Sequence, residues 1–118
     1  MSNTMIRSGT VLGTGATLNV PLGFAPDYVK VINFTDGESI EWTREMIEDG
    51  SPKYGIKEVA AGTKSVLATA AVGIDDYAGL ESDGSTLGIA KGFTIGATAG
   101  VNIAAEDIMW VAHFTDGP

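Results

Sequence analysis

Hydrophobic and polar side chains alternate along much of this chain, which is the pattern of strands that bury one face. In residues 16–22 (ATLNVPL), an aliphatic residue occupies every second position from Leu18 to Leu22. Residues 107–114 (DIMWVAHF) alternate in the same way. The pattern predicts one face with Ile108, Trp110, Ala112 and Phe114 and an opposite face with Met109, Val111 and His113.

The strongest predicted strand is YVKVINF (28–34), which is dense in β-branched and aromatic residues. Apolar residues occur on both of its faces, so we expect a central strand that is at least partly covered on both sides. Asp36-Gly37 then supplies a turn, and SIEWTRE (39–45) alternates again. The two segments and the short turn between them predict a β-hairpin.

The remaining segments are shorter or less regular. Residues 45–50 fit either one helical turn that ends at Gly50 or irregular structure. Residues 75–86 are polar and acidic and predict a long exposed loop. Further strands are expected at 5–12, 56–60, 64–72, 86–90, 92–96 and 101–105. About eight to ten short strands predict an all-β fold, either an antiparallel β-sandwich, jelly-roll-like in one variant, or a small barrel.

The chain of 118 residues fits one β-domain over residues 1–118, since no linker rich in proline and serine divides it. Its 16 glycines are spread along the whole length, as many turns require. Residues 1–15 are small, polar and glycine-rich. They are a candidate N-terminal arm that adds a strand to a neighbouring protein, with a frayed terminus as the alternative.

Charge and cysteine content exclude several functions. The net charge is −8 and the seven basic residues are scattered, which argues against binding to nucleic acid or to an anionic membrane. The absence of cysteine excludes disulfides, thiolate metal sites and cysteine nucleophiles. Neither a signal peptide nor a membrane span is recognisable, so we expect synthesis in the cytoplasm of the producing cell.

No residue stands out as catalytic, cofactor-binding or metal-binding. His113 is the only histidine, and no nucleophile motif accompanies it, so we expect a packed or edge position. GTGAT (13–17) lacks the lysine and the helix of a phosphate loop. Carboxylates are numerous, but nothing marks a catalytic pair among them. The acidic stretch Asp75–Asp83 leaves calcium binding open beside a simple solvated loop.

Two tryptophans, Trp42 and Trp110, each lie on an apolar strand face. Core packing is the common fate of such residues. If either ring were exposed, it would offer a platform on which sugars stack.

Three segments together resemble small virion proteins of tailed bacteriophages: APDYVKVINFTDGESIEW (25–42), VAAGTKSV (59–66) and GFTIGATAGVNIAAEDIMWVAHF (92–114). The resemblance covers about half of the chain and consists of strand and turn positions. It implies a non-enzymatic head decoration, or cement, protein on the capsid surface of the virion. Its implied partners are the major capsid protein and further copies of itself in a homotrimer. The alternative within the same class is a tail or fibre module that binds glycans of the host surface.

Overall fold

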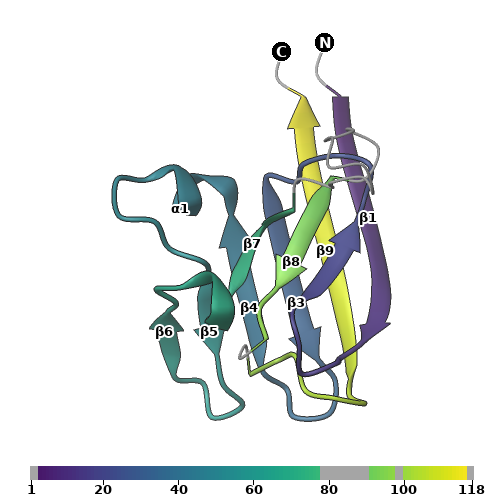
Figure 1. Ribbon diagram of the computed structural model, residues 1–118, viewed down its shortest axis with the longest axis vertical. Coiled ribbons are helices and arrows are strands. Elements are labelled where there is room, and N and C mark those ends of the chain that lie inside the picture. The colour runs from purple at the N-terminus through teal and green to yellow at the C-terminus, as the bar shows by residue number, and fades with distance from the viewer. Residues whose placement is uncertain (1–2, 78–90, 98–99, 117–118) are drawn as a thin grey trace.

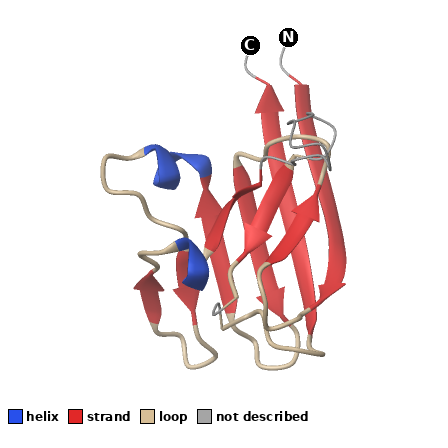
Figure 2. Ribbon diagram, viewed as in Figure 1, coloured by secondary structure: helices blue, strands red, loops and turns tan. Residues whose placement is uncertain are grey.

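The computed structural model describes residues 3–77, 91–97 and 100–116 of the chain. They form two antiparallel sheets with two short helical segments (Figures 1 and 2). The larger sheet has the order β1 (Asn3–Leu12), β9 (Asp107–Asp116), β3 (Tyr28–Asn33), β4 (Ser39–Thr43), β5 (Ile56–Glu58) and β6 (Lys64–Val66). The smaller sheet has the order β2 (Leu18–Pro21), β8 (Gly92–Ile95) and β7 (Ile74–Tyr77). The helical segments are α1 (Arg44–Glu48) and the 3-10 turn η1 (Ala70–Val72).

The all-β prediction is confirmed, and the two sheets face each other as in a sandwich. Apolar side chains at alternate positions of both sheets fill the space between them. The larger sheet contributes Val29, Val31, Ile40, Trp42, Ile108 and Ala112, all with no exposed surface. The smaller sheet contributes Val20, Ile74, Phe93 and Ile95, which are buried to a similar degree. The predicted inward face of residues 107–114 is therefore the one that meets this core, with Trp110 and Phe114 at its margin.

Three sequence predictions about local structure differ from the observed elements, and the choice left open at residues 45–50 is decided. Residues 74–77, which border and enter the predicted acidic loop, form strand β7. Residues 101–105 form turns instead of the predicted strand. The predicted strand over 64–72 ends at Val66 and gives way to η1. Residues 45–50, where two alternatives were open, contain the helical turn α1, which begins at Arg44. The strand predicted at 86–90 lies outside the described residues.

The N-terminal segment forms β1, which pairs with β9, and these two strands of ten residues each are the longest among the described residues. Its register pairs Asn3 with Asp116 at one end and Leu12 with Asp107 at the other. The candidate arm of residues 1–15 therefore lies, over Asn3–Leu12, within the chain's own sheet. β1 occupies one edge of that sheet, drawn purple at the right in Figure 1.

Candidate functional site

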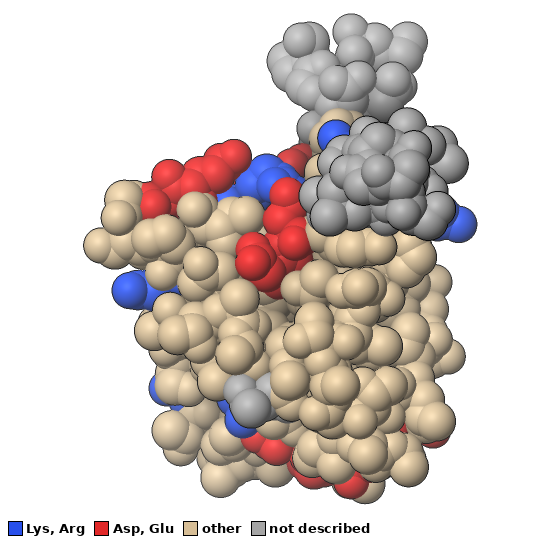
Figure 3. All heavy atoms as spheres, in the orientation of Figure 1, with Lys and Arg blue, Asp and Glu red and all other residues tan. Residues whose placement is uncertain are grey.

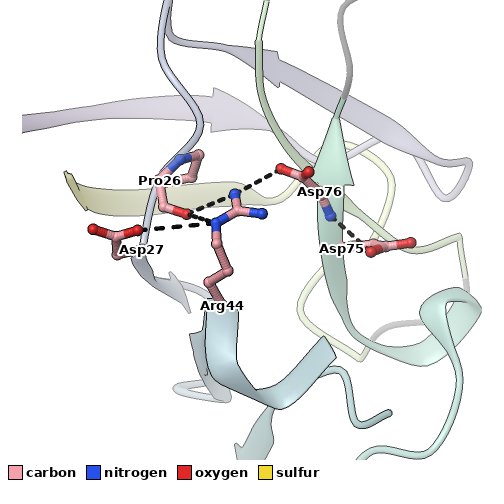
Figure 4. Close-up of polar contacts among 5 residues, drawn as sticks. All are labelled: Pro26, Asp27, Arg44, Asp75 and Asp76. Atoms are coloured by element: carbon pink, nitrogen blue, oxygen red, sulfur yellow. Dashed lines mark hydrogen bonds and ion pairs between the residues drawn. The ribbon is translucent and has the colours of Figure 1, made fainter. Parts of the chain in front are cut away.

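Two of the three ion pairs among the described residues involve Arg44, the first residue of α1 (Figure 4). Its guanidinium donates hydrogen bonds to the Asp76 carboxylate at 2.8 Å and to the Pro26 carbonyl at 2.8 and 3.1 Å. The carboxylate of Asp27 lies 3.9 Å away. Because Arg44 follows β4 and Asp76 lies in β7, this cluster ties the two sheets together.

The surroundings of Arg44 favour its charged form. The hydrogen bond to Asp76 raises the pKa of the Arg44 guanidinium, against the smaller opposing effect of burial. The same group lies 5.7 Å from the centroid of the Trp42 ring, within the range of a cation–π interaction. Since its Nε and Nη2 groups meet fixed acceptors and its guanidinium lies near the Trp42 ring, the cluster acts as a structural clamp.

Replacing Arg44 with methionine is expected to lower the free energy of unfolding by about 1–3 kcal/mol. Methionine keeps most of the aliphatic stem but leaves the Pro26 carbonyl and the Asp76 carboxylate without their donor. Urea unfolding measures the loss. The control is Lys53→Met, which removes a charge of the same sign from an exposed position. Equal unfolding midpoints for the two variants would contradict the clamp.

The acidic stretch Asp75–Asp83 shows no assembled metal site in its described part. The carboxylate of Asp76 is engaged by Arg44, and that of Asp75 accepts the backbone N–H of Asp76. Glu81 and Asp83 lie outside the described residues. Within residues 3–77, 91–97 and 100–116, no three histidine or carboxylate side chains gather closely enough to hold a metal ion.

Two buried amides, which sequence reasoning did not single out, organise the loops at one end of the sandwich. Asn102 accepts the backbone N–H groups of Thr14 and Gly15 and donates to the carbonyls of Ala16 and Gly96. This network explains why VNIAA forms turns in spite of its alternating pattern, because the Asn102 side chain replaces ladder partners.

Asn33 plays the corresponding role at the end of β3. Its amide donates to the Val101 carbonyl and to the Glu106 carboxylate, and its oxygen accepts the N–H groups of Thr35 and Asp36. The side chain has no exposed surface. The turn after β3 and the turns before β9 are therefore joined through one residue.

The outer face of the larger sheet carries an aromatic and carboxylate group around Tyr28. The hydroxyl of Tyr28 donates to the Glu41 carboxylate at 2.7 Å, and its ring lies 5.1 Å from that of His113. The pKa of Tyr28 is raised to about 12. Partial burial is the largest cause, followed by the hydrogen bond to Glu41 and the negative charge of that carboxylate. His113 thus packs against an aromatic neighbour, as the sequence predicted.

We expect phenolate absorbance to show Tyr28 ionising near pH 12, and the Glu41→Gln variant to ionise at lower pH. An unfolded tyrosine loses its proton near pH 10, so the folded chain holds this proton more tightly. The associated stability is therefore present below about pH 10 and is lost as the pH rises toward 12. The Tyr28→Phe variant identifies which part of the titration belongs to this residue. Unchanged curves for Tyr28→Phe and Glu41→Gln would refute the assignment.

The same outer face bears an exposed apolar patch, which we define as Leu12, Ile32, Phe34, Met109 and Val111. These residues come from β1, from β3 and the position after it, and from β9. Ile32 pairs with Met109, whereas Leu12 and Phe34 lie on either side of Asp107, which pairs with Leu12 and accepts the Phe34 N–H at its carbonyl. The exposed Asp107 therefore belongs to the same part of the outer face. Leu12 and Phe34 are each 57% exposed and Met109 is 38% exposed. Because no described residue covers these side chains, the outer apolar patch is the strongest candidate for a docking surface.

The tryptophans do not form an exposed platform. Trp42 is fully buried, as predicted. Trp110 is half-buried, with its ring in a T-shaped contact with Phe93 at 5.7 Å. The indole nitrogens of both are buried without a hydrogen-bond partner. Sugar stacking on Trp42 is therefore excluded by its position in the core.

No pocket opens on the surface formed by the described residues. Among the same residues, no helix has the length and apolar character needed to cross a membrane. The chain matches no protein-family model, and comparisons with curated proteins and with solved structures give no match either.

Proposed function

We propose that this chain is a non-enzymatic decoration protein that binds the outer surface of a tailed-phage head and braces the major capsid protein. The observation that carries the proposal is the outer apolar patch on an otherwise well-packed sandwich. The resemblance of residues 25–42, 59–66 and 92–114 to small virion proteins supplies the partner. The homotrimer and the virion location are parts of the same proposal and rest on the same resemblance.

The geometry of the sandwich suits this role. The patch lies on β1, β9 and β3, which include the two longest strands, so its side chains are held on a rigid support. Apolar side chains at the centre of an interface provide most of its affinity when they are fully desolvated on binding. A sheet face on which no pocket opens among the described residues fits a broad protein surface such as a capsid lattice better than it fits a small ligand.

Charge adds a second element to the proposed docking. The chain carries a net charge of −8, and on the side of the smaller sheet, which Figure 3 shows, acidic side chains gather toward the ends of the face with a broad uncharged area between them. Copies that repel one another over most of their surface remain soluble at the high concentration reached during virion assembly. The outer apolar patch encloses one carboxylate, that of Asp107 between Leu12 and Phe34, so the proposed docking needs a basic or hydrogen-bonding group of the capsid protein at this point.

The test is co-sedimentation with empty expanded capsids built from the major capsid protein of the same genome. We expect saturable binding at a fixed ratio to the capsid subunits. Phe34→Ser and Met109→Ser are expected to weaken binding by about tenfold or more, because each removes an apolar side chain from the centre of the contact.

The matched control is Val66→Ser. Val66 is 59% exposed and lies on β6, at the opposite edge of the same sheet and outside the patch. It should bind as the unaltered chain does. Equal loss in all three variants, or no binding of the unaltered chain, would count against the proposed docking surface.

A glycan-binding tail or fibre module is the second candidate, and the structure gives it less support. Its two proposed platforms are a fully buried Trp42 and a Trp110 whose ring edge packs on Phe93. Binding to immobilised host glycans together with absence from capsid pellets would favour this alternative.

A further inference from the structure

β1 lies at one edge of the larger sheet, and no strand among the described residues pairs with its outer side. In β9, the carbonyls of Asp107 and His113 accept N–H groups from the β3 side, so the odd-numbered residues of β9 bond toward β3 and the even-numbered ones toward β1. Their partners in β1 are odd-numbered, for example Gly9 opposite Trp110. The N–H and C=O groups of Ile6, Ser8, Thr10 and Leu12 therefore point away from the sheet, and no described residue bonds to them.

This edge carries few of the features that usually prevent pairing between edges. Natural edges are short, carry charged side chains or proline, point a charged side chain inward, or are bulged, and β1 has one of these features, the inward Arg7. The other edges of the described sheets follow this rule: β6 has three residues with Lys64, β2 has four with Pro21, and β7 has four with Asp75 and Asp76. β1 has ten paired residues, no proline and no acidic side chain.

Charge makes a second copy of the chain a suitable partner for this edge. Arg7 is the only charged residue of β1, so this strand has a charge of +1. The rest of the chain has a charge of −9, which gives the net charge of −8. The Arg7 side chain lies on the inner side of the strand, where its guanidinium donates to the Leu22 carbonyl at 2.8 Å. Two acidic molecules therefore meet with the least repulsion when their β1 edges approach.

Only some registers of two antiparallel β1 edges are compatible with a two-fold axis, because outward residues must face outward residues. The register that places Arg7 opposite Arg7 of the second copy opposes like charges and is disfavoured. The register centred on Gly9 pairs Ser8 with Thr10 of the second copy. It also pairs Ile6 with Leu12 of the second copy, which joins two side chains that are 61% and 57% exposed in the single chain.

We propose that this chain self-associates as a two-fold dimer through its β1 edges, in the register that pairs Ile6 with Leu12, to form one continuous sheet across both copies. The dimer extends each larger sheet and leaves the outer apolar patches on the same side of the assembly. This proposal does not depend on capsid binding, since it concerns the free chain, and its two-fold dimer takes the place of the homotrimer that the resemblance implies.

Sedimentation over a range of concentrations tests the association. We expect a monomer–dimer equilibrium, and we expect Ser8→Pro to raise the dissociation constant by roughly tenfold to a hundredfold, because proline removes the outward N–H of Ser8 in both copies. The N–H lost by this variant is not used within the sheet, so circular dichroism and the unfolding midpoint should stay close to those of the unaltered chain. Ser8→Ala keeps the N–H and is the matched control.

The absence of cysteine allows the register to be tested by cross-linking. The double variant Ile6→Cys/Leu12→Cys should form a covalent dimer on mild oxidation, because Cα atoms of a hydrogen-bonded pair lie about 5.5 Å apart, within disulfide range. The single variants Ile6→Cys and Leu12→Cys should not. A chain that is monomeric at all concentrations, an oligomer unaffected by Ser8→Pro, or a double variant that fails to cross-link would each overturn the proposal.

Discussion

Replacing Trp42 with alanine is expected to lower the free energy of unfolding by about 3–5 kcal/mol. Trp42 is the largest fully buried side chain, and it lies in the centre of the larger sheet between β3 and β5. Removing the indole leaves a cavity between the two sheets and takes the ring away from the Arg44 guanidinium. A loss of this size is a large share of the 5–15 kcal/mol that typically stabilises a small domain.

The loss should depend on volume more than on the indole N–H. The Trp42 indole nitrogen is buried without a hydrogen-bond partner, so Trp42→Phe gives up no hydrogen bond and should cost less than Trp42→Ala. Chemical denaturation measures both variants. The control is Phe34→Ala, which truncates an aromatic side chain that is 57% exposed and should change stability by less than about 1 kcal/mol. A Trp42→Ala loss no greater than that of Phe34→Ala would show that Trp42 is not a core residue.

Replacing Gly92 with alanine is also expected to lower the free energy of unfolding strongly. This variant tests the packing of the smaller sheet. A Cβ at this position would lie 1.9 Å from the Val20 carbonyl oxygen and 2.9 Å from the Val20 carbonyl carbon. Both are backbone atoms of β2, so β2 and β8 would have to separate. We expect a loss of about 3 kcal/mol or more, at or above the upper end for overpacking, because the hydrogen bond from Leu22 to the Lys91 carbonyl would also be disturbed.

The matched control for this variant is Gly50→Ala. A Cβ at Gly50 meets no atom within 4 Å, so the same chemical change should alter stability by no more than about 0.5 kcal/mol. Thermal unfolding of the two variants in parallel separates the effect of close backbone approach from that of losing a glycine. If Gly92→Ala unfolds at the same temperature as Gly50→Ala, the close packing of β2 on β8 is not present in solution.

Strands with a regular alternation were predictable from the sequence. YVKVINF contains β3 and SIEWTRE contains β4, which ends at Thr43 because Arg44 and Glu45 belong to α1. The inward face expected for DIMWVAHF is the one that reaches the core. In these segments the pattern succeeds because burial of one face decides both the structure and the register. The burial of Trp42 follows from the same argument.

Two of the failures, at β7 and at residues 101–105, have a common cause, since each depends on a contact far away in sequence. The acidic composition of β7 suggested a loop, but Arg44 neutralises Asp76 from across the sandwich. VNIAA alternates as a strand does, yet the Asn102 amide bonds residues 14–16, more than 80 positions earlier. Neither contact leaves a local signal that hydrophobic periodicity could detect.

The outer apolar patch was only partly visible in the sequence. Met109 and Val111 were expected on the face opposite the core, but the pattern of one strand does not say whether a second layer covers that face. The patch exists because Leu12, Met109 and Phe34 come from three strands that the topology brings together. Its recognition therefore required the strand order.

Imaging shows whether the outer apolar patch docks this chain on a phage head, as we propose. Expanded capsids built from the major capsid protein of the same genome are imaged after incubation with the purified chain. We expect regularly spaced extra density on the outer surface, with Phe34 and Met109 turned toward the capsid protein and the density lost with Phe34→Ser. Bare capsids, or density in which the opposite face of the sandwich meets the capsid, would contradict the proposal.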